Sequence, residues 1–219
     1  MPSSHIHQIT DLVEMIVASK ARSILDIGVG WGTYGFLSRL YLDVCDGRNK
    51  YRDWKCQIEG VEVFKEYITP VHDFVYNKIH IGNATDVIPS LKDKYDLTLL
   101  IDVLEHFTYE EGLKLLNDSL RCSRNVLVST PKEIGPQKDI YDNQYETHRF
   151  QWQKRHFRSF KNRAFVFNNY SLICCIGQDA NKMVATRKKI RRQMLVKQFL
   201  PQYIIEVYRR FKYRNTNRS

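Results

Sequence analysis

Residues 23–32, SILDIGVGWG, decide the fold. The apolar run SILDI ends directly in the alternating glycines Gly28, Gly30 and Gly32, a pattern that is typical of a buried strand entering a tight turn. Glycine lets the backbone approach a bound molecule closely, and the first N–H groups of a following helix are free to donate hydrogen bonds. The stretch therefore predicts a strand, a ligand-binding loop and a helix in direct succession.

The same alternation of strands and helices continues on both sides of this stretch. Apolar residues at helical spacing predict an opening helix over residues 6–19. Downstream, the patterns predict helices over 34–42, 68–76 and 110–120, strands over 57–63, 79–81, 95–102 and 125–129, and a closing hairpin over 164–167 and 171–176. Strands that alternate with helices form a parallel sheet covered on both faces. The predicted fold class is therefore α/β, with a doubly wound, mostly parallel seven-stranded sheet and a C-terminal antiparallel hairpin.

The length and composition indicate one globular domain with an appendage. With 219 residues, of which 43% are hydrophobic and 26% charged, the chain can bury a sizeable core but is too short for two full domains. Residues 182–219 carry 12 Lys/Arg and one acid, whereas residues 1–181 carry 22 Lys/Arg and 23 acids. We therefore expect a domain over 1–181 and a basic helical tail over 182–219, and the high net charge says little about the domain's substrate.

Three features of the sequence favour a cytoplasmic location. No apolar run approaches the roughly 20 residues of a membrane-spanning helix. Residues 1–15 lack a basic segment followed by an apolar one. The five cysteines are odd in number and include no C-x-x-C pair, so neither a disulfide framework nor a zinc knuckle is indicated.

The glycine loop fits neither of two common phosphate-binding types. It lacks the lysine and Ser/Thr of a P-loop, and its spacing departs from G-x-G-x-x-G. The sequence instead resembles the class I S-adenosylmethionine-dependent methyltransferases, whose first motif is an acid, an apolar residue and G-x-G-x-G after the first strand. The resemblance implies a Rossmann-like sheet, S-adenosylmethionine as cofactor and S-adenosylhomocysteine as product. It also implies that Asp26 faces the ammonium group of the cofactor and that Gly28, Gly30 and Gly32 leave room for it.

Further features fall where that family places its contacts, so the resemblance covers residues 24–131. Glu62 ends a predicted strand, and the resemblance implies that its carboxylate accepts hydrogen bonds from the ribose hydroxyls. A plain surface charge is the alternative. Asn83 and Ala84 follow the next strand, where the family commonly has an aspartate for the adenine amino group. An amide oxygen can accept the same bond, and the alternatives are Asp86 or a simple turn.

The fourth landmark is residues 102–107, DVLEHF, which resemble the D-x-L-E-H signature of ubiquinone-pathway and related small-molecule methyltransferases. The resemblance implies that Asp102 lies beside the methionine part of the cofactor. His106 is the first candidate for a general base, because imidazole can accept a proton near neutral pH. His148 is the second, since in this family the irregular segment after the fifth strand lies over the acceptor. The alternatives are that Glu105 only caps a helix, that His106 braces the loop and that His148 belongs to a packed lid.

A metal site and the N-terminal residues are two further features that bear on the predicted site. No metal site is predicted, because residues 129–132 after the fifth strand offer no acidic ligand; Glu146 with His148 is the one alternative. The N-terminal Ser3, Ser4, His5 and His7 could fold over the cofactor as a flap, but a frayed terminus is the favoured interpretation.

The tail contains a stretch, residues 200–211, in which apolar side chains recur at helical spacing opposite basic ones. This pattern predicts a basic amphipathic helix with Pro201 in its first turn. Such a helix packs on its own domain, lies on an anionic membrane surface or docks to a partner protein. Nucleic-acid binding is disfavoured because the domain has no basic excess. Peripheral attachment to a membrane surface is accordingly an alternative to a purely cytoplasmic location, and nothing in the sequence indicates an oligomeric state.

The function we expect is O-methylation of a small-molecule or glycan hydroxyl by in-line transfer with a histidine base. The glycan acceptor rests on the resemblance of the PSSH start and the YETHRFQW segment to methyltransferases of bacterial or viral surface-polysaccharide synthesis. The alternatives are methylation of RNA or protein, and a cofactor-binding regulatory module without catalysis. The absence of an N-P-P-Y type motif weakens methylation of a nucleobase.

Overall fold

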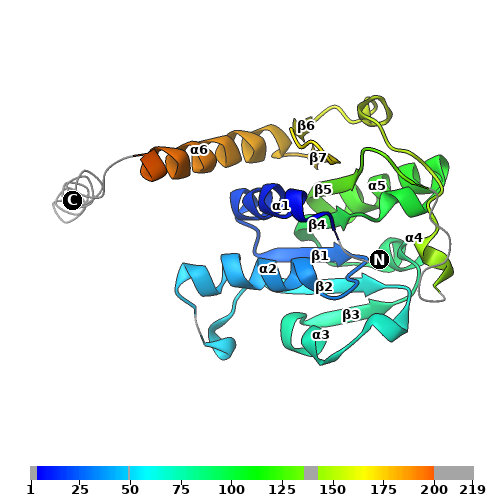
Figure 1. Ribbon diagram of the computed structural model, residues 1–219. Coiled ribbons are helices and arrows are strands. Elements are labelled where there is room, and N and C mark those ends of the chain that lie inside the picture. The colour runs from blue at the N-terminus through cyan, green and yellow to red at the C-terminus, as the bar shows by residue number, and fades with distance from the viewer. Residues whose placement is uncertain (1–3, 49, 136–142, 200–219) are drawn as a thin grey trace.

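A seven-stranded sheet forms the centre of the molecule, and helices cover both of its faces (Figure 1). The computed structural model describes residues 4–48, 50–135 and 143–199. The strand order is β3-β2-β1-β4-β5-β7-β6. The strands are β1 (Ser23–Ile27), β2 (Gln57–Glu62), β3 (Lys78–Ile81), β4 (Tyr95–Ile101), β5 (Ser123–Pro131), β6 (Arg163–Val166) and β7 (Ser171–Gly177).

Strand directions confirm the predicted fold class. β1 pairs in parallel with β2 and β4, and the parallel pairs β2–β3 and β4–β5 extend the sheet on either side. Only β7 runs against its neighbours, because it is antiparallel to both β5 and β6. The chain winds outward from β1 to β3 and then returns to place β4 on the other side of β1. Ligands of such sheets bind at the carboxyl ends of the strands where this reversal occurs.

The α-helices of the described residues largely match the predicted ones. They are α1 (Ile6–Ser19), α2 (Thr33–Leu42), α3 (Pro70–Val75), α4 (Ala84–Ser90), α5 (Tyr109–Cys122) and α6 (Ala180–Phe199). The sequence pattern did not predict α4, which has seven residues and contains Pro89. Its amino end is fixed by Asn83, whose side chain accepts a hydrogen bond from the Thr85 N–H. Two turns are too short to display a helical period, so the capping residue was the available signal.

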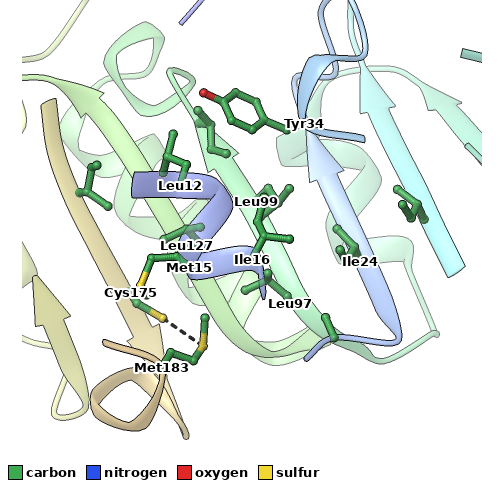
Figure 2. Packing of buried hydrophobic residues seen from close by; sticks show 14 of the residues in the cluster. Leu12, Met15, Ile16, Ile24, Tyr34, Leu97, Leu99, Leu127, Cys175 and Met183 are labelled. Atoms are coloured by element: carbon green, nitrogen blue, oxygen red, sulfur yellow. Dashed lines mark hydrogen bonds between the residues drawn. The ribbon is translucent and has the colours of Figure 1, made fainter. Parts of the chain in front are cut away.

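The core is divided by the sheet into two layers, and alternate strand residues belong to opposite layers. Ile24, Leu99 and Leu127 pack with α1, α2, α3 and α6 on one face. Leu25 and Leu100, from the same strands, pack with α4 and α5 on the other. Figure 2 shows the first layer, in which Leu12, Met15 and Ile16 of α1 lie against the sheet and Met183 of α6 approaches Cys175.

Helix α6 is fastened to the domain through α1 (Figure 1). Ala180, Met183 and Val184 are buried in the core. One turn further, the buried Arg187 forms ion pairs with Asp11 and with Glu14, the latter at 3.0 Å. The amphipathic helix predicted over residues 200–211 lies outside the described residues. Among the described helices, none has the length and apolarity needed to cross a membrane.

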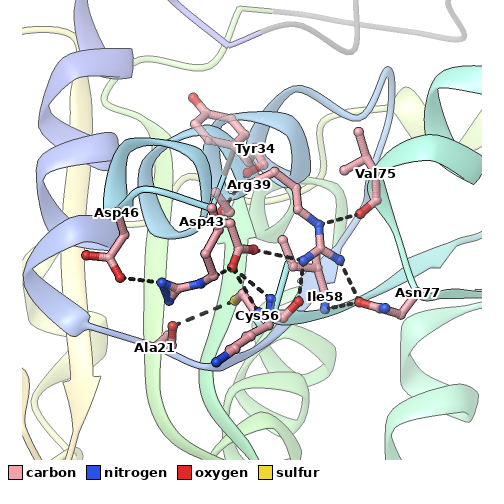
Figure 3. A network of polar contacts seen from close by, with 12 residues as sticks. Ala21, Tyr34, Arg39, Asp43, Asp46, Cys56, Ile58, Val75 and Asn77 are labelled. Atoms are coloured by element: carbon pink, nitrogen blue, oxygen red, sulfur yellow. Dashed lines mark hydrogen bonds and ion pairs between the residues drawn. The ribbon is translucent and has the colours of Figure 1, made fainter. Parts of the chain in front are cut away.

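A buried polar network ties the segment between α2 and β2 to the sheet, at the end away from the strands' carboxyl ends (Figure 3). Arg39 donates to the carbonyl of Val75 at 2.9 Å, to Asn77 Oδ1 at 2.6 Å and to Asp43 Oδ2 at 3.1 Å. Asp43 in turn accepts from the Lys55 N–H at 2.9 Å. A buried guanidinium is tolerated because each charge has partners. The carboxyl ends of the strands, at the opposite end of the sheet, take no part in this network.

Candidate functional site

A cavity of about 680 Å³ opens at the carboxyl ends of β1, β2 and β4. Its wall is built from the loop between β1 and α2, the start of α4, residues 101–107, residues 143–149 and the amino end of α1. The volume is within the range of small-molecule and cofactor sites. The cavity therefore lies at the topological reversal point that the sheet order predicts for a ligand.

The glycine loop adopts backbone conformations that side chains other than glycine rarely reach. Gly28, Gly30 and Gly32 have φ values of 71°, 50° and 79°. A Cβ on Gly28 would stand 2.7 Å from Cγ2 of Val103. Gly28 and Gly30 line the cavity, whereas Gly32 lies outside the lining and begins α2 as its N-cap. Only the first two glycines border the ligand space.

Two buried side chains support this loop from behind. Asp26 is 3% exposed, does not line the cavity and accepts a hydrogen bond of 2.6 Å from the Tyr76 hydroxyl. Burial raises the pKa of the Asp26 carboxyl to about 7. His72 Nε2 donates to the carbonyl of Gly30 at 2.9 Å. Asp26 contacts Tyr76 behind the loop because it shares the α2 face of the strand with Ile24, and its contact with a bound ammonium group stays a prediction.

Glu62 stands at the end of β2 and lines the cavity. One carboxylate oxygen accepts the Gly30 N–H at 3.0 Å and the other accepts the Phe64 N–H, also at 3.0 Å. Burial raises the pKa of this carboxyl, and the backbone N–H groups of Phe64, Gly30 and Val63 oppose that shift. The carboxylate is therefore held rigidly against the glycine loop, and each oxygen keeps a lone pair for a further donor.

Asn83 and Ala84 line the cavity where β3 passes into α4. The Asn83 Oδ1 accepts from the Thr85 N–H at 3.0 Å and from the Thr85 hydroxyl at 2.9 Å. The amide oxygen predicted to bind an adenine amino group is therefore engaged as a helix cap. Asp86, the alternative, is exposed and lies outside the cavity lining.

Asp102 follows β4 and lines the cavity in a left-handed conformation, with φ of 55°. Its Oδ2 accepts from Gln8 Nε2 at 2.6 Å, and Gln8 Oε1 accepts from the Ser129 hydroxyl at 2.5 Å. Gln8 is fully buried, on the same face of α1 as Leu12. Sequence analysis missed Gln8, although a glutamine on the apolar face of an amphipathic helix is the signal that could have found it.

Two of the N-terminal residues lie at the site, which differs from the expectation of a frayed terminus; Ser3 lies outside the described residues, and His7 does not line the cavity. Ser4 and His5 line the cavity. The His5 ring stacks on Tyr170 with ring centroids 4.1 Å apart. The stacked ring and the buried Gln8 one turn later hold this segment in place.

Both predicted histidines line the cavity and face one another. The ring centroids of His106 and His148 are 5.2 Å apart. His106 belongs to the short helix η4 (Leu104–His106), and its Nδ1 donates to the carbonyl of Thr147 at 3.2 Å. His148 Nδ1 donates to the carbonyl of Gly135 at 3.0 Å. Burial lowers the pKa of His106 to about 4, so the ring is neutral at physiological pH.

The segment that carries His148 is a lid hydrogen-bonded to η4. The carbonyl of Glu105 accepts from the N–H of Arg149 at 2.7 Å and of Phe150 at 3.2 Å. Trp152 is 1% exposed and donates to the carbonyl of Leu104 at 2.9 Å. The sequence allowed either a packed lid or a segment on the acceptor side. The segment is both, since it packs on the domain and also presents Tyr145, His148 and Arg149 to the cavity.

Solved structures share this architecture. The N-terminal domain of EvdMO1, in the presence of SAH and D-fucose, has a TM-score of 0.57 and 16% identity, covering 80% of this chain and 84% of that one. The methyltransferase domain of bacterial CtHen1 has a TM-score of 0.53 and 18% identity, covering 78% and 98%. An O-methyltransferase family protein from Burkholderia thailandensis has a TM-score of 0.53 and 13% identity, covering 77% and 56%. The fold is that of the class I S-adenosylmethionine-dependent methyltransferases. No protein-family model and no curated protein matches the sequence itself.

Within this methyltransferase fold, the predicted cofactor residues divide into two groups. The residues that line the cavity are Gly28, Gly30, Glu62, Asn83, Ala84 and Asp102. Asp26 lies behind the loop, and Gly32 ends the loop as the N-cap of α2, so neither lines the cavity. The structure adds the buried Glu105, with 1% exposure, to the wall beside the two histidines.

Proposed function

We propose that this protein binds S-adenosylmethionine in the cavity and transfers its methyl group to an acceptor hydroxyl. The observation that carries the proposal is the carboxylate of Glu62, fixed by the Gly30 N–H at the open glycine loop in a class I methyltransferase fold. Such a carboxylate accepts ribose hydroxyls, by the logic that applies in dinucleotide folds. The SAH named with solved structures of the same fold, EvdMO1 and the magnesium protoporphyrin IX methyltransferase ChlM, supports the same ligand.

The remaining lining residues suit the other parts of the donor. Gly28 and Gly30 give the backbone close access, Ala84 offers a small apolar wall, and Asp102 presents a carboxylate toward a positively charged amino-acid end. We assign Asn83 to the purine edge through its amide NH₂ group, because its oxygen already caps α4.

The acceptor we propose is the hydroxyl of a small molecule or a sugar. His106 and His148 stand together in the wall, and the lid adds Tyr145 and Arg149, which suit a polar ring. The D-fucose named with the EvdMO1 structure supports a sugar. In the reaction the S–CH₃ bond breaks as the O–CH₃ bond forms, the bonding electron pair stays on sulfur, and a histidine accepts the hydroxyl proton. Burial lowers the pKa of His106 to about 4, which weakens this ring as a proton acceptor.

Calorimetry with S-adenosylmethionine and S-adenosylhomocysteine tests the donor assignment. We expect saturable 1:1 binding, and a loss of at least about tenfold in affinity for Glu62→Gln, equivalent to roughly 1.4 kcal/mol, because the amide can no longer accept from two hydroxyls. Glu66→Gln is the matched control, since Glu66 is exposed and outside the cavity. Equal affinity of Glu62→Gln and the native protein would contradict the assignment.

A further inference from the structure

One wall of the cavity carries three side chains whose donor atoms converge. A carboxylate oxygen of Glu105 and a ring nitrogen of each of His106 and His148 lie within 4.8 Å of one another. We propose that these three side chains bind a divalent first-row transition-metal ion, such as Mn²⁺ or Co²⁺, on the acceptor side of the cavity. The proposal differs from the sequence-based expectation of no metal, which rested on the lack of an acidic ligand directly after β5; the lid brings His148 to η4, a contact between residues far apart in the sequence.

The carboxylates at this wall have hydrogen-bonding capacity that ordinary hydrogen bonds among the described residues leave unused. Glu105 is 1% exposed, and its Oε2 has no hydrogen-bond partner of ordinary length and angle among the described residues; the Thr130 side chain is the donor that acts on this carboxyl. The shielded Oδ1 of Asp102, three residues earlier in the chain, also lacks a partner of ordinary geometry, and Ser4 is the further side chain that acts on that carboxyl. Buried polar atoms normally have hydrogen-bond partners, and burying an ionised carboxylate without a partner costs free energy. A cation between Glu105 and the histidines would bind this carboxylate oxygen and give it a partner.

The imidazole rings are oriented as metal ligands require. Each Nδ1 faces a backbone carbonyl, of Thr147 for His106 and of Gly135 for His148. A carbonyl oxygen can only accept a hydrogen bond, so Nδ1 carries the proton of each ring. Nε2 is then unprotonated, and its lone pair is available to a metal ion. A hydrogen bond from the second ring nitrogen to a carbonyl is the usual way in which proteins fix the tautomer and orientation of a ligating histidine.

The donor set selects the class of ion. Two imidazoles and one carboxylate suit Mn²⁺, Fe²⁺, Co²⁺ or Zn²⁺ better than Ca²⁺, which prefers six or more oxygens. Three protein ligands leave coordination positions open toward the cavity, as in catalytic metal sites. Those positions are available to oxygen atoms of an acceptor.

The role of the ion rests on the proposed function. Coordination would orient the acceptor hydroxyl and lower its pKa, which favours the oxygen nucleophile. The O–CH₃ bond then forms as the S–CH₃ bond breaks, the electron pair stays on sulfur, and the hydroxyl proton passes to water. The histidines would act as ligands, and the general-base role proposed above would pass to the ion and solvent.

Cobalt titration of the EDTA-treated protein tests the site directly. We expect one Co²⁺ per chain with visible absorption bands from imidazole ligation, and Mn²⁺ should compete for it. Glu105→Gln and His148→Ala should each weaken Co²⁺ binding by more than about tenfold, since removal of a ligand exceeds the loss typical of an outer partner. His148 lies on the lid, so its variant keeps the fold even if Glu105→Gln does not.

A control variant excludes binding by surface imidazoles. His5 and His7 have ring centroids 5.2 Å apart at the N-terminus, and His7 does not line the cavity. His7→Ala should therefore leave Co²⁺ affinity unchanged. Absence of saturable binding, undiminished binding in both cluster variants, or loss of binding in His7→Ala would each overturn the inference.

Donor binding separates failure of this inference from failure of the proposed function. Calorimetry with S-adenosylhomocysteine on metal-free protein measures the donor site alone. Donor binding without any Co²⁺ site would overturn the cation inference and leave the methyltransferase proposal standing. A Co²⁺ site lost in the two cluster variants, in a protein that binds no donor, would support the cation site and reject the methyltransferase proposal.

Discussion

At the scale of single residues, Asp26 couples the glycine loop to pH. Its pKa is about 7 when folded, against 3.8 for the ordinary carboxyl, and burial is the main cause. Between these values the folded chain holds a proton that the unfolded chain has lost. The free energy of unfolding should therefore fall as pH rises through this window, by roughly 4 kcal/mol at most, and level off above about pH 7.

Asp26→Asn should remove this dependence, because the amide oxygen still accepts from Tyr76 but has no proton to lose. Urea denaturation of both proteins from about pH 4 to pH 8 gives the comparison. We expect the native protein to lose stability relative to the variant as pH rises. Parallel stability curves would show that Asp26 is not the group responsible.

The sequence predicted which residues lie at the edge of the sheet better than it predicted the direction of their side chains. Glu62 could be placed because an acid at the end of a buried strand must lie at the sheet edge. Asp26 could be placed only by counting alternation, since it shares a face with Ile24 rather than Ile27. Glu105 and His148 meet through a lid segment, and no local pattern reports a contact between residues so far apart.

At the scale of elements, α1 serves the site as well as the core. Gln8 links Asp102 to Ser129 through two hydrogen bonds, and its side chain is fully buried. Gln8→Ala would leave Asp102 Oδ2 without its donor, so we expect a loss of about 1–3 kcal/mol in the free energy of unfolding. We also expect weaker binding of S-adenosylhomocysteine, because Asp102 would lose its fixed orientation.

Thermal denaturation and calorimetry of this variant give the two readouts. Gln193→Ala, at an exposed position of helix α6, is the matched control and should change neither. A variant that is destabilised but binds donor with native affinity would limit Gln8 to a structural role.

The helices and strands themselves were largely predictable from the sequence, since strand and helix periods differ, whereas α4 was too short to show a period.

At the scale of the whole molecule, the candidate site and the buried polar network that stabilises the sheet lie at opposite ends of the sheet. The Arg39 network lies at one end of the sheet, and the cavity lies at the other, at the carboxyl ends of β1, β2 and β4. The sheet order followed from the sequence because strands alternating with helices admit few topologies. The lid and the N-terminal segment did not, because their positions depend on tertiary contacts such as Trp152 with Leu104 and His5 with Tyr170.

A crystal structure of the protein grown with S-adenosylhomocysteine tests the central claim most directly. The account predicts the ligand in the cavity at the carboxyl ends of the strands, with its ribose hydroxyls on Glu62 and its purine beside Asn83 and Ala84. The methionine end should lie near Asp102, and the sulfur should face His106 and His148. A cavity without ligand at saturating concentration, or a ligand bound elsewhere on the chain, would contradict it.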